Sequence, residues 1–291
     1  MFKNYHPAVN LIFFSFVIGL SMFSTNPYFI GAALISAWAY SAVLKGRKAF
    51  KTNFILMIPI VIFMAVINTL FTHNGETVLF YLNASRITLE ALIFGIVGAF
   101  LLSTVLIWFT VFSEIMSSEK LIYIFGKARP VLGLTFSMIF RFIPLLKERF
   151  REIHMGQQCM GRGEEETFVG KIRQFTREVS ILISWSLEAA IETSDSMEAR
   201  GYGLPGRTSF HIFKMTPKDY KLLAEIIILG GFVVTCGFLG ELKITFYPEF
   251  VVPDWTILRI IALICFTILC FIPIFLDKKE ERKWQLLKSK I

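Results

Sequence analysis

Long apolar segments alternate with short polar connections along most of this chain. Six apolar stretches occur among its 291 residues, at about 8–24, 28–44, 53–71, 88–112, 221–240 and 256–276. A helix needs roughly 20 apolar residues to cross the hydrocarbon core of a bilayer. The first two stretches are short and are separated only by Ser24-Thr25-Asn26-Pro27, which is typical of a tight helical hairpin. The pattern therefore predicts an all-α polytopic membrane protein with about six transmembrane helices.

Residues 113–219 follow a different pattern, in which apolar residues recur at helical spacing among many charged ones. In 131–153 the apolar stripe consists of Leu132, Phe136, Ile139, Phe140, Ile143 and Leu146, and in 172–200 of Ile172, Phe175, Val179, Leu182, Ile183 and Leu187. This spacing favours amphipathic helices that lie along or just under the membrane surface. Pro130 and Pro144 are expected to start or interrupt them.

The charge distribution sets the expected orientation. The net charge is +8, and basic residues concentrate at 45–51 and in the 277–291 tail, whereas 72–87 and 241–255 are poor in them. Because basic residues stay on the cytoplasmic side, six spans place both termini and the 113–219 region in the cytoplasm. The same distribution argues against nucleic-acid binding, since the basic residues lie at membrane edges and not on a separate domain.

The composition supports the membrane class and offers no catalytic centre. Hydrophobic residues make up 55% of the chain and the mean hydropathy is +0.61, which no soluble domain requires. The four cysteines, at 159, 236, 265 and 270, form no CxxC or Cys/His spacing, so we expect neither a disulfide nor a metal site. His154 and His211 stand apart and are expected at the surface or at an interface.

Two arginine–glycine pairs lie at the expected ends of the amphipathic helices. Arg200-Gly201 closes the stretch SDSMEARGYG, and Arg162-Gly163 lies in QQCMGRGEEE. A glycine that adopts positive φ is a common helix C-cap. The preceding arginine can interact with the carbonyl end of its helix or pair with a carboxylate on another protein. Two such ends on the same side of the membrane favour docking.

These motifs give the chain a family resemblance. SDSMEARGYG resembles the Ala-Arg-Gly signature of the transmembrane T component of energy-coupling factor (ECF) transporters, which import vitamins and metals. YHPAVNLIFF and the stretch RPVLGLTFSMIFRFIPLLKERFREIHMGQQCMGRG are similar to other parts of that family, so the resemblance covers most of the chain. The first signature departs from the family at Gly161, where alanine is usual. Since glycine costs a helix about 1 kcal/mol relative to alanine, we expect this helix to end early.

The resemblance implies both partners and site residues. Such T components join two cytosolic ABC-type ATPases to a small substrate-binding membrane subunit, with lipid around the spans. It implies that Arg162 and Arg200 dock the ATPases, with Gly163 and Gly201 as caps and Ala199 as the small neighbour. The apolar faces at 120–150 and 172–195 would then grip the substrate-binding subunit. The resulting domains are an N-terminal membrane domain at 1–112, a coupling-helix region at 113–219, and C-terminal membrane helices with a basic tail at 220–291.

The sequence also indicates how ATP would act. It contains no GxxxxGK[ST] motif, so it has no P-loop, and ATP and Mg²⁺ are expected on the partner ATPases with no cofactor in this chain. We expect the protein not to be an enzyme. Movement of the ATPases would change the crossing angle of the two anchored helices.

The sequence bears on three other functions. An autonomous transporter would place ionisable residues within its spans, and these spans contain almost none. A membrane-bound enzyme could use Glu188, Glu192 and Asp195 as an acidic site for Mg²⁺, but a solvated helix face explains them better. The permease subunit of a conventional ABC transporter is the main alternative, although it would dock ATPases through short helices in separate loops.

Overall fold

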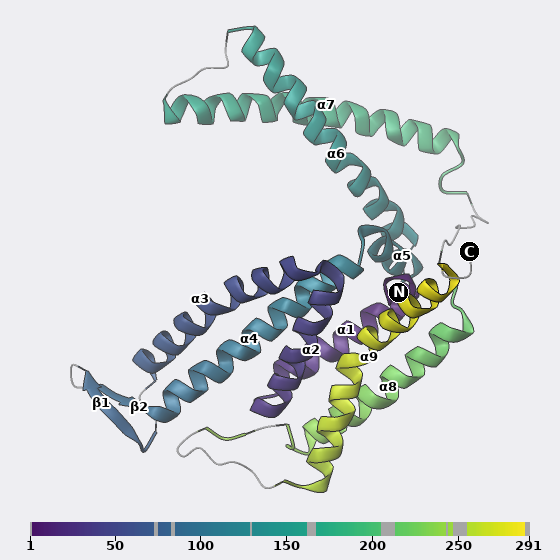
Figure 1. The fold of residues 1–291 in the computed structure, drawn as a ribbon. Helices are drawn as coiled ribbons and strands as arrows, with labels where there is room; N and C mark the ends of the chain where they lie inside the picture. Colours follow the sequence, from purple (N-terminus) through teal and green to yellow (C-terminus); the bar gives the residue numbers. More distant parts are fainter. Residues whose placement is uncertain are drawn as a thin grey trace. The chain divides into compact units, whose positions relative to one another are not determined.

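The computed structural model is built almost entirely of helices (Figure 1). It describes residues 2–72, 75–82, 85–128, 130–161, 167–204, 213–242, 244–246 and 255–288. The elements are η1 (Phe2–Asn4), α1 (Pro7–Phe23), α2 (Pro27–Lys45), α3 (Arg47–Phe71), β1 (Val78–Leu82), β2 (Ser85–Thr88), α4 (Leu89–Ile115), α5 (Ser118–Ala128), α6 (Pro130–Cys159), α7 (Phe168–Ala199), α8 (Pro217–Phe238) and α9 (Ile257–Lys288).

The chain divides into two compact units. The first, the membrane unit, comprises residues 1–117 and 213–291, and the second, the α5–α7 unit, comprises residues 118–212. In the membrane unit, α4 packs against α1, α2 and α3, while α9 packs against α2 and α8. The α5–α7 unit is built from the pairs α5–α6 and α6–α7.

The expected membrane spans are present as helices. In the described residues, α2, α3, α4, α8 and α9 are long and apolar enough to cross a membrane. The sixth expected span is α1, an apolar helix of 17 residues, which is at the lower end of the spanning range of roughly 17–25 residues. The prediction of an all-α polytopic membrane protein is confirmed.

Aromatic side chains fill the core of the membrane unit. Trp108 of α4 is fully buried and makes edge contacts with Phe13 and Phe14 of α1, at centroid distances of 6.0 and 6.1 Å. Tyr40 of α2 and Phe2 of η1 are also fully buried beside this group. Buried phenylalanines therefore contribute directly to helix packing in this unit.

Polar contacts tie together the elements at one end of the membrane unit. The backbone N–H of Phe2 donates to the buried Asp277 of α9, which also accepts from the Tyr40 hydroxyl at 3.3 Å. Lys45 at the end of α2 lies 3.3 Å from Glu114 near the end of α4. This end therefore holds the start of the chain together with two basic segments, the α2–α3 connection and the part of α9 that follows Asp277.

A second set of contacts closes the opposite end. The backbone N–H of Thr25 donates to Leu242 O at 3.2 Å, and its hydroxyl accepts from the Ile244 N–H at 3.1 Å. The rings of Tyr28 and Trp255 lie 4.9 Å apart between centroids. The poorly basic connections thus gather at this end, as six alternating spans require.

A short β-hairpin at the same end was not predicted. β1 and β2 pair antiparallel between α3 and α4, with Tyr81 opposite Arg86. Glu90 at the start of α4 is buried and accepts hydrogen bonds from the backbone and hydroxyl of Thr77, at 3.2 and 2.5 Å. A hairpin this short contains too few alternating positions to give a clear sequence signal.

The α5–α7 unit differs in detail from the expected helices. The range 120–150 is divided between α5 and α6, because Pro130 starts a new helix, as expected. Pro144, by contrast, lies inside α6 without ending it. Gly126 and Gly133 allow α5 and α6 to meet closely, since a Cβ on Gly133 would lie 2.5 Å from the Cα of Gly126. The second expected segment, 172–195, lies within α7.

Candidate partner-docking site

The end of α7 has the capped geometry that its sequence predicts. Ala199 is the last helical residue, Arg200 is the C-cap, and Gly201 adopts φ +80°. The N–H of Gly201 donates to Glu198 O at 2.9 Å, and the N–H of Tyr202 donates to Met197 O at 3.0 Å. These two bonds form a Schellman motif. Backbone groups therefore satisfy these two terminal carbonyls, and the Arg200 side chain is not required for that task.

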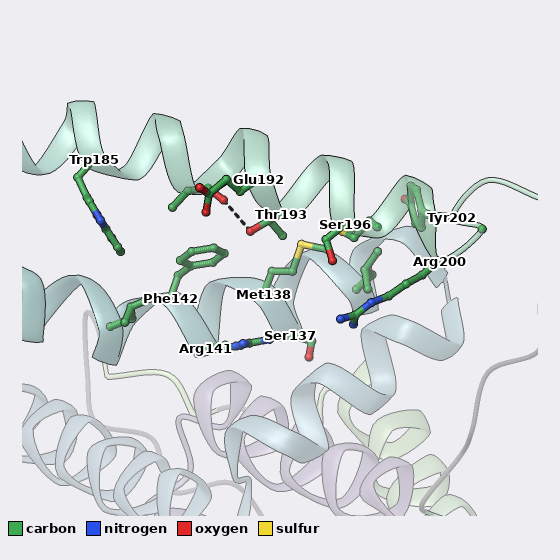
Figure 2. Close-up of a pocket in the computed structure, with 15 residues that line it drawn as sticks. Ser137, Met138, Arg141, Phe142, Trp185, Glu192, Thr193, Ser196, Arg200 and Tyr202 are labelled. Atoms are coloured by element: carbon green, nitrogen blue, oxygen red, sulfur yellow. Dashed lines mark hydrogen bonds between the residues drawn. The ribbon is translucent and has the colours of Figure 1, made fainter.

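The Arg200 side chain lines a groove between α6 and α7. The groove has a volume of about 670 Å³, and Figure 2 shows Arg200 extending from the end of α7 over it, in the direction of α6. Met138, Phe142 and Trp185 supply apolar walls, and Arg141 adds a second guanidinium. A cation beside apolar walls suits a partner that presents a carboxylate together with apolar side chains.

The end of α6 confirms the expected early termination. The helix ends at Cys159, and Gly161 adopts φ +71° with its N–H donating to Gln158 O at 2.9 Å. Gly161 therefore takes the left-handed conformation that is typical of a residue following a helix. Arg162 and Gly163 lie outside the described residues, so their docking role stays a prediction.

The two long helices cross at a polar contact that the sequence reasoning missed. Glu178 of α7 is only 2% exposed, and its Oε1 lies 2.9 Å from both His154 Nδ1 of α6 and Gln174 Nε2 of α7. His154, expected at a surface or interface, thus contacts α7 at the crossing. The signal available in the sequence was the Gln174–Glu178 pair at i,i+4 beside an apolar stripe.

The apolar stripes of α6 and α7 face outward. Phe175, Ile183 and Leu187 on α7 are more than half exposed, and Ile143 on α6 is 54% exposed. Exposed apolar patches of this kind mark contact with another protein or with lipid. The stripes are therefore available to a partner, as the resemblance implies.

The acidic residues that a membrane-bound enzyme would use to bind Mg²⁺ lie on the surface of α7. Glu188, Glu192 and Asp195 are all exposed, and Glu192 lines the groove beside Arg200. In the described part of the chain, no group of three or more His, Cys, Asp or Glu side chains is arranged to hold a metal ion.

The chain is similar to known transport proteins of the membrane. The family described as "CbiQ: Cobalt transport protein" matches residues 3–212. The energy-coupling factor transporter transmembrane protein EcfT of Lactococcus lactis is 30% identical over 214 residues, which are 69% of this chain and 77% of the relative. EcfT of Bacillus selenitireducens is 26% identical over 238 residues, 77% of this chain and 89% of the relative. The chain therefore belongs to the CbiQ cobalt transport protein family and is a multi-pass membrane component related to the T components of energy-coupling factor transporters.

Proposed function

We propose that this protein is the coupling subunit of an ECF-type importer of a vitamin or metal ion. Two cytosolic ABC-type ATPases would bind ATP and Mg²⁺, and a small membrane subunit would bind the substrate. The chain itself would hold no cofactor and catalyse no reaction. The relatives are transporter transmembrane proteins, which supports the transport part of this proposal.

The observation that supports ATPase docking most strongly is the position of Arg200. Its guanidinium is exposed at the end of a 32-residue helix whose cap is made by backbone hydrogen bonds. A side chain that is not needed for capping can pair with a partner carboxylate, and a bidentate pair becomes strong when water is excluded. A continuous helix also transmits displacement from its tip to the apolar face further along.

The orientation follows from the same proposal. The end of the membrane unit that holds the basic α2–α3 connection and the basic part of α9 would face the cytoplasm, together with both termini. The α5–α7 unit, which joins α4 to α8, would then lie on the side where ATP is available.

Charge reversal of the arginines tests the docking role. We expect Arg200→Glu to abolish co-purification of the two ATPases with the full-length chain, and Arg162→Glu to weaken it. Arg200→Lys should restore binding only in part, because lysine lacks the planar fork of donors. The matched control is Arg173→Glu, on an exposed residue of the same helix far from its tip. Equal ATPase recovery with Arg200→Glu and with the control would contradict the proposal.

A further inference from the structure

We infer that Glu178, His154 and Gln174 form a pivot cluster that fixes the point about which α6 and α7 rotate against each other. Glu178 accepts from side chains of both helices at this point, at 2.9 Å each. Its role in transport rests on the proposed function, whereas the geometry of the pivot can be tested in the isolated full-length chain.

The burial of Glu178 sets it apart from its neighbours. Among the described carboxylates of residues 118–204, it alone is buried, and the others are exposed. A buried carboxylate costs more to desolvate than an apolar side chain of similar size, so it contributes specificity rather than extra stability. Directional hydrogen bonds to His154 resist sliding of one helix along the other, which apolar packing alone would tolerate.

Contacts on both sides of the ring hold the His154 imidazole in place. A carboxylate oxygen accepts hydrogen bonds, so the contact with Glu178 is made when His154 Nδ1 carries the proton. His154 Nε2 then accepts from the amide of Gln158, which lies 3.2 Å away on the next turn of α6. Gln158 thereby holds the imidazole toward α7. Gln157 is also buried at this face of α6, and among the described residues its Oε1 has no hydrogen-bond partner.

The contacts that flank the pivot cluster tolerate rotation. The rings of Phe150 and Phe175 lie 6.0 Å apart, and the guanidinium of Arg149 lies over the ring of Trp185 at 4.9 Å. Ring contacts depend weakly on orientation compared with hydrogen bonds. Beyond Trp185 the two helices are separated by the 670 Å³ groove, so their separation there can vary.

The position of the pivot cluster makes α7 a long lever. At 1.5 Å per residue, the distance along α7 from Glu178 to Ala199 is about 30 Å, whereas His154 lies about 7 Å from the end of α6 at Cys159. A rotation of about 10° at the pivot would therefore move the Arg200 end by about 5 Å. Movement of the partner bound at Arg200 would open or close the groove and re-orient the apolar stripes.

The first experiment measures the helix pair in the isolated full-length chain. Spin labels on cysteines at Thr135 of α6 and Glu198 of α7 report the distance across the groove, with Cys159 and Cys265 replaced. We expect a narrow distance distribution in the parent, and also in Glu178→Gln, which keeps an acceptor oxygen. Glu178→Leu should lose the narrow distribution. The matched control Glu188→Leu, an exposed glutamate on the same helix, should retain it.

The width of the label-distance distribution in the Glu178 variant decides whether the pivot cluster holds the two helices. A Glu178→Leu distribution as narrow as the control, at the same distance, overturns the inference. If Glu178→Leu does not fold, His154→Ala replaces it, because it removes the α6 half of the cluster and leaves Gln174 in place. His154→Ala is likewise expected to broaden the distribution, and an unchanged distribution overturns the inference.

The second experiment uses the complex with the ATPases and asks for the effect of ATP and Mg²⁺. We expect ATP to shift the label distance to a second defined value in the parent. With Glu178→Leu the ATPases should still co-purify, because Arg200 is intact, but the defined shift should be lost. A parent-like shift in Glu178→Leu overturns the coupling role of the pivot. Failure of the unmodified chain to retain the ATPases contradicts the proposed function instead and leaves the first experiment valid.

Discussion

The conformation of one glycine positions the candidate docking arginine. Gly201 adopts φ +80°. The backbone N–H groups of Gly201 and Tyr202 donate hydrogen bonds to carbonyls in the last turn of α7. A side chain on Gly201 would meet two obstacles. The left-handed conformation disfavours a Cβ, and a Cβ there would lie 3.1 Å from Leu204 Cδ1. The direction of the Arg200 side chain therefore depends on the residue that follows it.

Substitution of Gly201 should weaken docking without touching the arginine. We expect Gly201→Val to cost the capped conformation about 1–2 kcal/mol and to lower the affinity for the ATPases. Gly201→Asn should retain most of the affinity, because asparagine tolerates the left-handed conformation. The measurement is the dissociation constant of the chain–ATPase complex for each variant. Equal weakening by valine and asparagine would show that φ at this position is not the cause.

At the scale of whole elements, the helices of the α5–α7 unit reverse the usual arrangement of polar and apolar residues. Polar Glu178 and Gln174 are buried where α6 and α7 cross, and apolar Phe175 and Leu187 are largely exposed. The helix pair α5–α6 instead depends on close backbone contact at Gly126 and Gly133. These helices are thus joined at small, specific contacts and leave broad apolar surfaces for a partner.

The contact between α5 and α6 gives a prediction with a control on the same helix. Gly133→Ala places a methyl group against Gly126, and we expect it to destabilise the pair by about 1–3 kcal/mol. On α6, a Cβ at Gly156 would meet no atom within 4 Å. Gly156→Ala should therefore leave the free energy of unfolding unchanged or raise it by up to about 1 kcal/mol. The unfolding temperature in detergent and the rate of limited proteolysis within 118–161 are measured for both variants and for the parent. A parent-like result for Gly133→Ala would contradict the close contact.

At the scale of the whole molecule, the two ends of the membrane unit differ in charge. Asp277, Lys45 and Glu114 lie at the end that holds the basic segments, and the β-hairpin lies at the other end. Because positively charged residues are retained in the cytoplasm, the two ends should differ in their access to reagents added outside the cell.

Labelling of single cysteines measures this orientation. In a background without exposed Cys159, a membrane-impermeant maleimide should label Glu76→Cys in intact cells. It should label Lys51→Cys only after permeabilisation. Both positions are exposed in the structure, so burial does not explain a difference. The opposite pattern would place both termini outside and would contradict the proposed orientation.

The membrane class, the helical segments and the cap at Gly201 were determined by the sequence itself. Each of these depends on local properties: about 20 apolar residues in a row specify a span, and a glycine after a helix specifies its end. The early end of α6 also followed from a local cause, the low helix propensity of Gly161.

Only the tertiary structure decided which residues of the long helices meet. The contact of Glu178 with His154, the groove that contains Arg141 and Arg200, and the approach of Gly126 to Gly133 all join residues that hydrophobic periodicity cannot pair. Periodicity identifies the faces of one helix at a time, whereas a crossing depends on how the chain turns between two helices. The sequence therefore predicted the helix that contains Glu178 but not the burial of Glu178.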